Sequence, residues 1–254
     1  MSIAQGIIQA IRQGIKQGTN SLFGSGGIAP VDLRSIDLDG SADYFTIPDS
    51  AAVQPSSAVG TSLYIYWDAL PTSFQTDMLT HKWVSAQASY LVYVINFAGE
   101  YRLYFSCTDT GSTSGPSCYV VITPSISTWY QFTVSSAPDG GTPASFTSFW
   151  QDAVSLGAPT AGVAGTASSF YDGTSPIGWN GGHGINGKIA ELRLYNRELG
   201  QAEVTAGFGT NIDESTSGLV TYIHATPAGI LDVSDVGSTV TEAGTPTLDT
   251  EVPF

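Results

Sequence analysis

The sequence predicts an all-β fold, an antiparallel β-sandwich preceded by a short helical arm. From about residue 28 onward, short runs rich in β-branched and aromatic residues alternate with Gly, Pro, Ser and Asp. Such runs with regular turn signals are typical of sandwiches and barrels. Before that point, isoleucine and small residues recur every four positions, which is the spacing of one side of a helix.

The N-terminal segment predicts a helix with two stripes that lie on different sides. The apolar stripe consists of Ile3, Ile7, Ile8, Ile11 and Ile15. The stripe of small residues consists of Gly6, Ala10, Gly14 and Gly18. Each glycine weakens a helix by about 1 kcal/mol relative to alanine, and so short a helix is marginal alone. Its stability must therefore come from a neighbouring surface.

That surface belongs either to the same chain or to a partner. Residues 24–27, Gly-Ser-Gly-Gly, are typical of a flexible tether, and small residues let another backbone approach closely. We therefore expect the arm to bind a partner, and self-association into a dimer or trimer is plausible. A helix on a membrane surface is a weaker third reading, because two cations and four glutamines make a modest polar face.

The strands and one short helix follow in order along the body. The clearest predicted strands are residues 44–47, 62–67, 90–97, 101–107, 118–122, 129–135, 146–151, 188–196 and 218–224. Residues 200–207 predict a short helix, and 218–224 followed by 232–254 predict edge strands and an ordered extension. The predicted organisation is thus an arm and linker at 1–27 and a sandwich with a C-terminal extension at 28–254.

Composition excludes several classes of protein. Apolar residues make up 42% of the 254 residues, enough for a sizeable core, whereas charged residues make up only 12%. Eight Lys and Arg against 22 Asp and Glu give 8 − 22 = −14, which argues against nucleic-acid binding. No apolar run approaches the ~20 residues of a membrane span. The N-terminus also lacks the basic and apolar regions of a Sec signal peptide.

Four stretches of the body carry a family resemblance. They read IDLDGSADYFTIP at 36–48, WYQFTV at 129–134, FWQDAVSLG at 149–157 and GKIAELRLYNREL at 187–199. These resemble motifs of the laminin-G-like, concanavalin A-like jelly-roll family, which occurs in lectins and in many phage and bacterial surface proteins. The last is the most specific, matching G-x-I-x-E-(hydrophobic)-R-(hydrophobic)-Y-N-R-x-L. The resemblance covers about residues 28–208 and implies a jelly-roll sandwich.

Two details of these stretches lead to further expectations. Ala153 stands where the family has glycine, which predicts an altered hairpin. Glu191, Arg193 and Arg197 are expected to pair with nearby charges at the sheet edge.

The family includes glycoside hydrolases, so catalysis must be weighed. Retaining hydrolysis needs two carboxylates about 5 Å apart. Laminarinase-like relatives place them in Glu-x-Asp-x-x-Glu on one strand, a pattern that this sequence lacks. His81, His183 and His224 are isolated from one another, and no G-x-S-x-G elbow is present, although Ser/His/Asp catalysis stays open. We expect a protein that is not an enzyme.

A structural calcium ion is one candidate ligand. Asp37, Asp39 and Asp43 bring three carboxylates into one short stretch, and hard oxygen ligands suit Ca²⁺. Relatives often hold one structural calcium near the sheet edge, which makes Asp39 and Asp43 the candidate ligands. The alternative, which we favour, is an ordinary turn at Asp39-Gly40 with a solvated Asp43.

Carbohydrate would need exposed aromatic rings. Of the five tryptophans, most fall in strand patterns typical of the core. Trp179, in the glycine-rich stretch 178–184, is the best candidate for a loop contact, and the alternative is that it closes the end of the sandwich. Cys107 and Cys118 flank a loop and could form a disulfide or remain buried thiols.

Together these observations lead to a functional hypothesis that rests partly on the resemblance. We expect a non-enzymatic structural protein of a tailed-phage virion, a capsid decoration protein assembled in the host cytoplasm. Its arm would bind the major capsid protein or another virion protein. The alternatives are a tail-fibre module that binds a host glycan or receptor, and an exported bacterial lectin-like protein.

Overall fold

A computed structural model describes residues 34–253 except 56, 180–183, 210–215 and 235. The predicted arm with its two stripes, the linker and His183 lie outside the described residues. Within the described part, no helix is long and apolar enough to cross a membrane.

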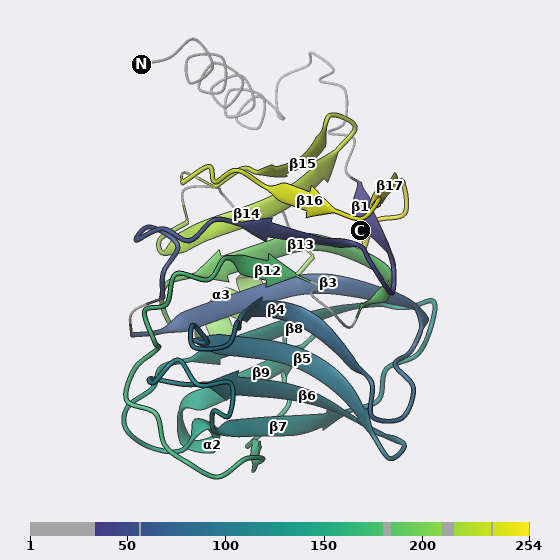
Figure 1. The fold of residues 1–254 in the computed structure, drawn as a ribbon. Coiled ribbons are helices and arrows are strands. Elements are labelled where there is room, and N and C mark those ends of the chain that lie inside the picture. Colours follow the sequence, from purple (N-terminus) through teal and green to yellow (C-terminus); the bar gives the residue numbers. More distant parts are fainter. Residues whose placement is uncertain (1–33, 56, 180–183, 210–215, 235, 254) are drawn as a thin grey trace, which may run out of the picture. The chain divides into compact units, whose positions relative to one another are not determined.

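The described residues form two antiparallel sheets that pack face to face, with β4 to β7 in front of β3, β8 and β9 (Figure 1). Sheet A follows the order β10 (Val154–Ser155), β9 (Thr147–Gln151), β8 (Trp129–Ser136), β3 (Val59–Ala69), β13 (Asn186–Tyr195), β1 (Ser35–Asp39) and β17 (Thr247–Asp249). Beside β13, β14 (Leu219–Thr226) pairs with it and with β15 (Gly229–Asp232). Sheet B follows the order β11 (Thr160–Ala161), β7 (Ser117–Ile122), β6 (Glu100–Cys107), β5 (Tyr90–Phe97), β4 (Thr76–Lys82), β12 (Ile177–Trp179), β2 (Tyr44–Ile47) and β16 (Thr241–Ala243). The predicted all-β sandwich is confirmed.

The predicted strands coincide with β2, β3, β5, β6, β7, β8, β9, β13 and β14. The predicted short helix is α3 (Gln201–Gly207), and a further one-turn helix, α2 (Pro143–Phe146), precedes β9. The C-terminal residues add the edge strands β16 and β17, as predicted. The expected edge position of 218–224 is wrong, because β14 pairs with β13 on one side and with β15 on the other. Alternation did not indicate β4, because its polar Asp77 and Lys82 are buried and a bulge interrupts its pairing between Met78 and Thr80.

The main core lies between the two sheets. Alternate residues of β3 (Leu63, Ile65 and Trp67) point into it, and so do Val92 and Val94 of β5. Burying one such aliphatic side chain contributes about 1.5–3 kcal/mol. Along the second half of β5 the outer side chains are half-buried or exposed, and this face of sheet B carries the candidate site.

A second core fills the outer face of sheet A beneath α3. It consists of Trp150, Tyr195, Leu199, Val204, Leu219 and Tyr222. The helix begins after Gly200, whose N–H donates to Glu203 Oε2 at 3.0 Å, so the Glu203 side chain caps the first turn. Arg197 Nη2 lies 2.5 Å from Glu203 Oε1, so the expected pairing of Arg197 is present.

The expected sheet-edge position of Glu191 and Arg193 is wrong. Their strand, β13, lies between β3 and β14 in the middle of sheet A, and both side chains are buried. They pair with each other, with Arg193 Nη2 3.3 Å from Glu191 Oε2. A register shift between Ala190 and Arg193, with Glu191 at φ 51°, turns both side chains toward the same buried space.

Candidate functional site: an aromatic groove on sheet B

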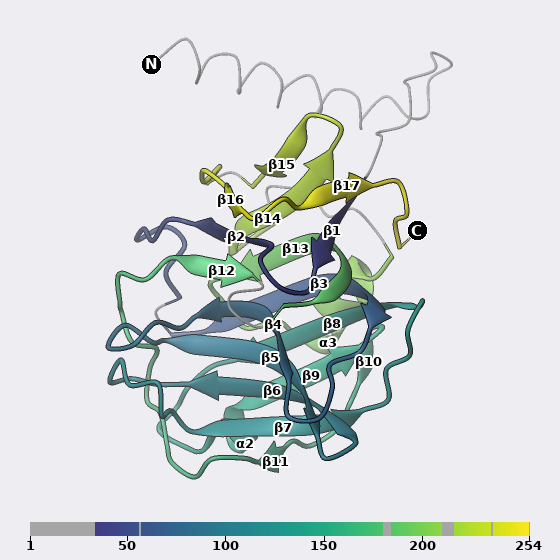
Figure 2. The same cartoon turned by 45° about the vertical axis from the view of Figure 1, so that its right-hand side comes forward.

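Three tyrosines form a row on the outer face of sheet B. The strand pairing places Tyr93 of β5 opposite Tyr104 of β6, and Tyr104 opposite Tyr119 of β7; Figure 2 shows these strands side by side. The ring centroids are 5.0 and 4.9 Å apart, with interplanar angles of 10° and 28°. This separation is close to the distance between neighbouring strands. The rings therefore stack on one another, and the Tyr93 side chain also forms a hydrogen bond with Ser106.

Arg102 lies between two aromatic rings at one end of this row. Its guanidinium carbon is 4.4 Å from the ring centroids of both Phe97 and Tyr119, its diagonal neighbours on β5 and β7. Its Nε donates to Glu100 Oε1 at 2.5 Å. Hydrogen bonds with Tyr104 and then with Glu100 raise the pKa of Arg102, so it stays charged.

On β5, Phe97 connects Arg102 to an exposed phenylalanine in the β3–β4 loop. Phe74 packs edge to face on Phe97, with ring centroids 5.4 Å apart. The exposed fractions of the two residues are 64% for Phe74 and 43% for Phe97. We call the continuous series Tyr93, Tyr104, Tyr119, Arg102, Phe97 and Phe74 the aromatic arc.

A hollow of about 330 Å³ lies along the arc, and we call it the aromatic groove. Its lining consists of the three tyrosines, Ile95, Phe97, Arg102, Ser117 and residues 161–163. Ser117 Oγ accepts the Val163 N–H at 2.8 Å and thereby holds the wall formed by 161–163. Gly162 allows this close approach, because a Cβ there would lie 2.5 Å from Ser117 Oγ and 3.0 Å from a Tyr104 ring carbon.

The groove combines apolar ring surface with polar groups that keep their protons. Burial, and then the neighbouring Tyr104, raises the pKa of Tyr93 to about 12. Its hydroxyl is thus protonated at neutral pH and can both donate and accept a hydrogen bond. Together with the Arg102 guanidinium, this surface suits a ligand that carries both C–H faces and hydroxyls.

The candidate calcium ligands Asp39 and Asp43 accept hydrogen bonds from backbone N–H groups. Asp39 Oδ1 accepts the N–H groups of Ser41 and Ala42 at 2.8 and 3.0 Å, and these bonds lower the pKa of Asp39 to about 2. Asp43 is buried, and its Oδ1 accepts the Thr245 N–H at 2.6 Å. Among the residues that the structure describes, no three His, Cys, Asp or Glu side chains are placed to hold a metal ion. The geometry is that of the alternative, a turn, except that Asp43 is not solvated.

The other predicted candidates are placed as follows. Trp67 and Trp150 are buried, and Trp83 and Trp129 are half-buried. The backbone of Trp179 pairs with Phe45 of β2, but its side chain lies outside what the structure describes. Cys107 and Cys118 are free, buried thiols rather than a disulfide.

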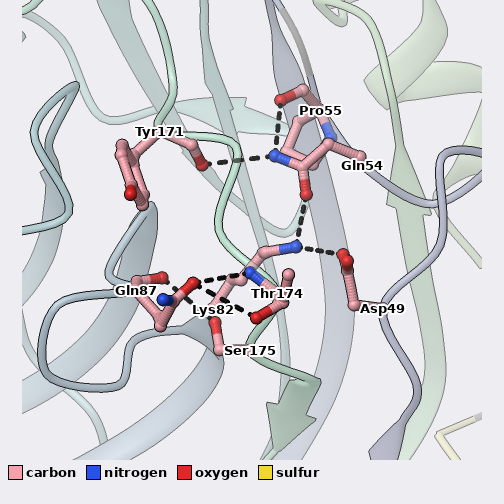
Figure 3. A network of polar contacts seen from close by, with 8 residues as sticks. All are labelled: Asp49, Gln54, Pro55, Lys82, Gln87, Tyr171, Thr174 and Ser175. Carbon is pink, nitrogen blue, oxygen red and sulfur yellow. Dashed lines mark hydrogen bonds and ion pairs between the residues drawn. The ribbon is translucent and has the colours of Figure 1, made fainter.

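A polar cluster separate from the groove lies at the end of sheet B where β4 ends (Figure 3). Lys82 is fully buried, and its Nζ contacts Asp49 Oδ1 and Gln54 Oε1. Gln54 Nε2 donates to the Tyr171 carbonyl at 3.3 Å, and Gln87 Oε1 accepts the Thr174 N–H at 2.7 Å. These bonds tie three loops together, so the cluster holds the loops in place at this end of the sheet.

Sequence reasoning missed the aromatic groove, although one signal pointed to part of it. A two-residue turn at Ala98-Gly99 pairs Phe97 with Glu100 and therefore Tyr93 with Tyr104. No comparable signal exists for Tyr119, because the irregular connection at 108–116 leaves the register of β7 undetermined.

Comparison with known proteins identifies the family and the fold. The Laminin_G_3 family model, described as the concanavalin A-like lectin/glucanases superfamily, matches residues 39–205. No curated protein matches the chain. A candidate carbohydrate binding protein from Bacteroides ovatus shares the fold with a TM-score of 0.57 and 11% identity, over 85% of this chain and 59% of its own. The SAP-like pentraxin of Limulus polyphemus, which is heptameric, gives a TM-score of 0.59 and 10% identity, over 87% of this chain and 97% of its own. At such identities the likeness concerns the fold alone.

Proposed function

This chain belongs to the concanavalin A-like lectin/glucanase superfamily, and from that premise we propose that it is a carbohydrate-binding protein whose ligand occupies the aromatic groove. The observation that carries the proposal is the aromatic arc, which surrounds a guanidinium with rings and tyrosine hydroxyls. A sugar presents apolar C–H faces and a rim of hydroxyls, and this surface offers a partner for each. The fold shared with the Bacteroides ovatus protein supports the proposal.

We propose binding without catalysis. Hydrolysis of a glycosidic bond uses a pair of carboxylates on either side of the scissile bond. The groove is lined by tyrosine, arginine, serine, phenylalanine and small or aliphatic residues, a set that can orient a sugar. The carboxylate of Glu100, which contacts the arc, forms an ion pair with Arg102.

The proposal is tested by a glycan array followed by calorimetric titration of the best ligand. We expect the full chain to bind at least one glycan and Tyr104→Ala to weaken binding about tenfold or more, since Tyr104 contacts both neighbouring rings. The matched control is Tyr44→Ala, an exposed tyrosine on β2 of the same sheet, which should bind as the wild type does.

Three results would contradict this assignment. Absence of binding to every glycan would remove the proposed function. Binding that Tyr104→Ala leaves unchanged would remove the groove as its site. If Trp179→Ala abolished binding instead, the predicted loop contact at Trp179 would be the site.

A second proposal concerns attachment to a larger particle. The four-residue repeat of isoleucine and small residues, followed by a Gly-Ser tether, favours an arm that binds a partner. We propose a tailed-phage capsid as that partner, with the domain bound alone or as an oligomer, because phages use similar domains on their surfaces. Co-sedimentation with undecorated capsids tests it by comparing the full chain with a chain that begins at residue 28. Pelleting of the full chain alone would support the anchor, whereas pelleting of neither would exclude capsid decoration.

A further inference from the structure

We propose that the binding site extends beyond the groove along β5, through Phe97 to Phe74, so that its ligand is an extended, neutral oligosaccharide rather than a single terminal sugar. This inference rests on the proposed function and specifies the ligand class of the same site.

Phe74 is held outward by a well-bonded turn. Its backbone is left-handed, with φ 64°, a conformation that glycine adopts more easily than phenylalanine. Its N–H donates to the Asn96 carbonyl at 2.7 Å. The buried side chain of Asn96 in turn donates to the Pro71 carbonyl at 3.0 Å and accepts the Gly99 N–H at 2.8 Å. A strained, exposed aromatic residue that its surroundings hold in place is a mark of a functional position.

The arc makes Phe74 continuous with the groove. Phe74 contacts Phe97, Arg102 covers both Phe97 and Tyr119, and Tyr119 stacks on Tyr104. Phe97 and Arg102 also line the groove, so a ligand in the groove can reach Phe74 without crossing an unrelated surface. Exposed apolar area of this kind marks a binding surface when polar groups border it.

The placement of the two phenylalanines suits a polymer. Tyr93 and Phe97 lie four residues apart on the same strand, β5, so a chain that follows this strand passes from the tyrosines to Phe97 and then to Phe74. Four residues of a strand span about 13 Å, which is longer than one hexose. Because the tyrosine rings cover one another's faces and Arg102 covers Phe97, the apolar face of a sugar would pack on Phe74, which is 64% exposed.

Charge favours a neutral chain. The Arg102 guanidinium is already paired with Glu100, so it offers hydrogen bonds without an unbalanced positive charge. The protein as a whole carries a formal charge of −14, which repels polyanions at long range. Polymers of uronic acids are therefore disfavoured relative to neutral hexose chains.

Calorimetric titration with saccharides of increasing length tests the inference. The probes are the mono-, di-, tetra- and hexasaccharides of the cello-, laminari- and manno- series, with oligogalacturonates as the anionic comparison. Affinity for the bound neutral series should rise with length through the tetrasaccharide. Phe74→Ala should weaken hexasaccharide binding roughly three- to tenfold, as expected for one aromatic contact, and leave disaccharide binding unchanged. Leu231→Ala, which removes an exposed apolar side chain from β15 of sheet A, is the control and should have no effect.

The outcomes distinguish failure of this inference from failure of the proposed carbohydrate binding. Equal affinity for the monosaccharide and the hexasaccharide would overturn the extended site and leave carbohydrate binding intact. Unchanged hexasaccharide binding by a folded Phe74→Ala variant would exclude Phe74, and tighter binding of oligogalacturonates would exclude the neutral ligand. Failure of every saccharide, anionic probes included, would remove the proposed function itself.

Discussion

The guanidinium carbon of Arg102 lies 4.4 Å from the centroid of the Tyr119 ring, although the two residues belong to different strands and are not directly paired. They are diagonal neighbours across β6 and β7, a distance that only a long side chain can span. Together with the hydrogen bond between Arg102 and Tyr104, this contact joins the tyrosine row to the two phenylalanines.

Arg102→Lys is expected to weaken ligand binding roughly three- to tenfold. Lysine keeps the charge but lacks the planar group that lies against two rings and donates several hydrogen bonds in fixed directions. Calorimetric titration with the ligand found on the array measures the change. Arg197→Lys, at the α3 side of sheet A, is the matched control; an equal loss in both variants would argue against a specific role for Arg102.

Asp77 should make stability depend on pH. Burial raises the pKa of its carboxyl to about 7 despite the Trp67 Nε1–H, which donates to Asp77 Oδ2 at 2.8 Å. Between pH 3.8 and about 7 the folded protein therefore holds a proton that the unfolded chain has lost. Stability falls as pH rises through this window, by about 4 kcal/mol in total, and the change ends above it.

Asp77→Asn removes that dependence, because an amide does not titrate. Urea unfolding of both proteins at several pH values between 4 and 8 measures the difference in their free energies of unfolding. We expect the free energy of unfolding of the variant, relative to that of the wild type, to increase as pH rises. Because this is a difference between two proteins, the contributions of other groups such as Asp39 cancel. Parallel curves would show that Asp77 has an ordinary pKa.

Glu191→Ala is expected to destabilise the fold by about 3–5 kcal/mol, the usual cost of removing one partner of a buried ion pair. The carboxylate pairs with Arg193, accepts a hydrogen bond from the Tyr222 hydroxyl and lies 3.3 Å from His224 Nδ1. Its loss leaves a buried guanidinium without its carboxylate. Chemical denaturation measures the change, and Glu242→Ala, at an exposed position of β16, should change stability little. A loss below about 1 kcal/mol would mean that water replaces the carboxylate.

The two cysteines should be unreactive in the native protein. Burial raises the pKa of both Cys107 and Cys118 to about 12, so neither forms the reactive thiolate near neutral pH. A thiol assay with Ellman's reagent should detect both groups in guanidinium chloride and neither in native buffer. Detection of no thiol after denaturation would instead indicate a disulfide.

Ala153→Gly is expected to stabilise the protein by about 0.5 kcal/mol. The β9–β10 hairpin has a two-residue turn in which Asp152 and Ala153 have φ values of 50° and 62°, so alanine occupies a left-handed position that suits glycine. Ala202→Gly, at an exposed position of α3, is the control of opposite sign and should cost about 1 kcal/mol. Destabilisation by both changes would show that the Ala153 methyl group matters more than its backbone.

Strand locations followed from the sequence because alternation is a local property. Runs such as 90–97 became β5 with the same bounds, since every second side chain had to enter the core whatever its partner strand. The motif at 187–199 likewise produced β13 and led to α3. The expected edge position of Glu191 failed for the complementary reason: the order β3–β13–β14 depends on pairings between distant segments.

The sequence by itself thus determined the all-β class, the family motif, most of the strands and the acidic, cation-poor surface. Only the tertiary structure decided which exposed side chains meet. The register of β6 and β7 places Tyr119 beside Tyr104. The hydrogen bond from the Phe74 N–H to the Asn96 carbonyl holds Phe74 against Phe97. Local patterns specify which face a side chain occupies, whereas register and loop geometry, set by packing of the whole sandwich, specify its neighbours on that face.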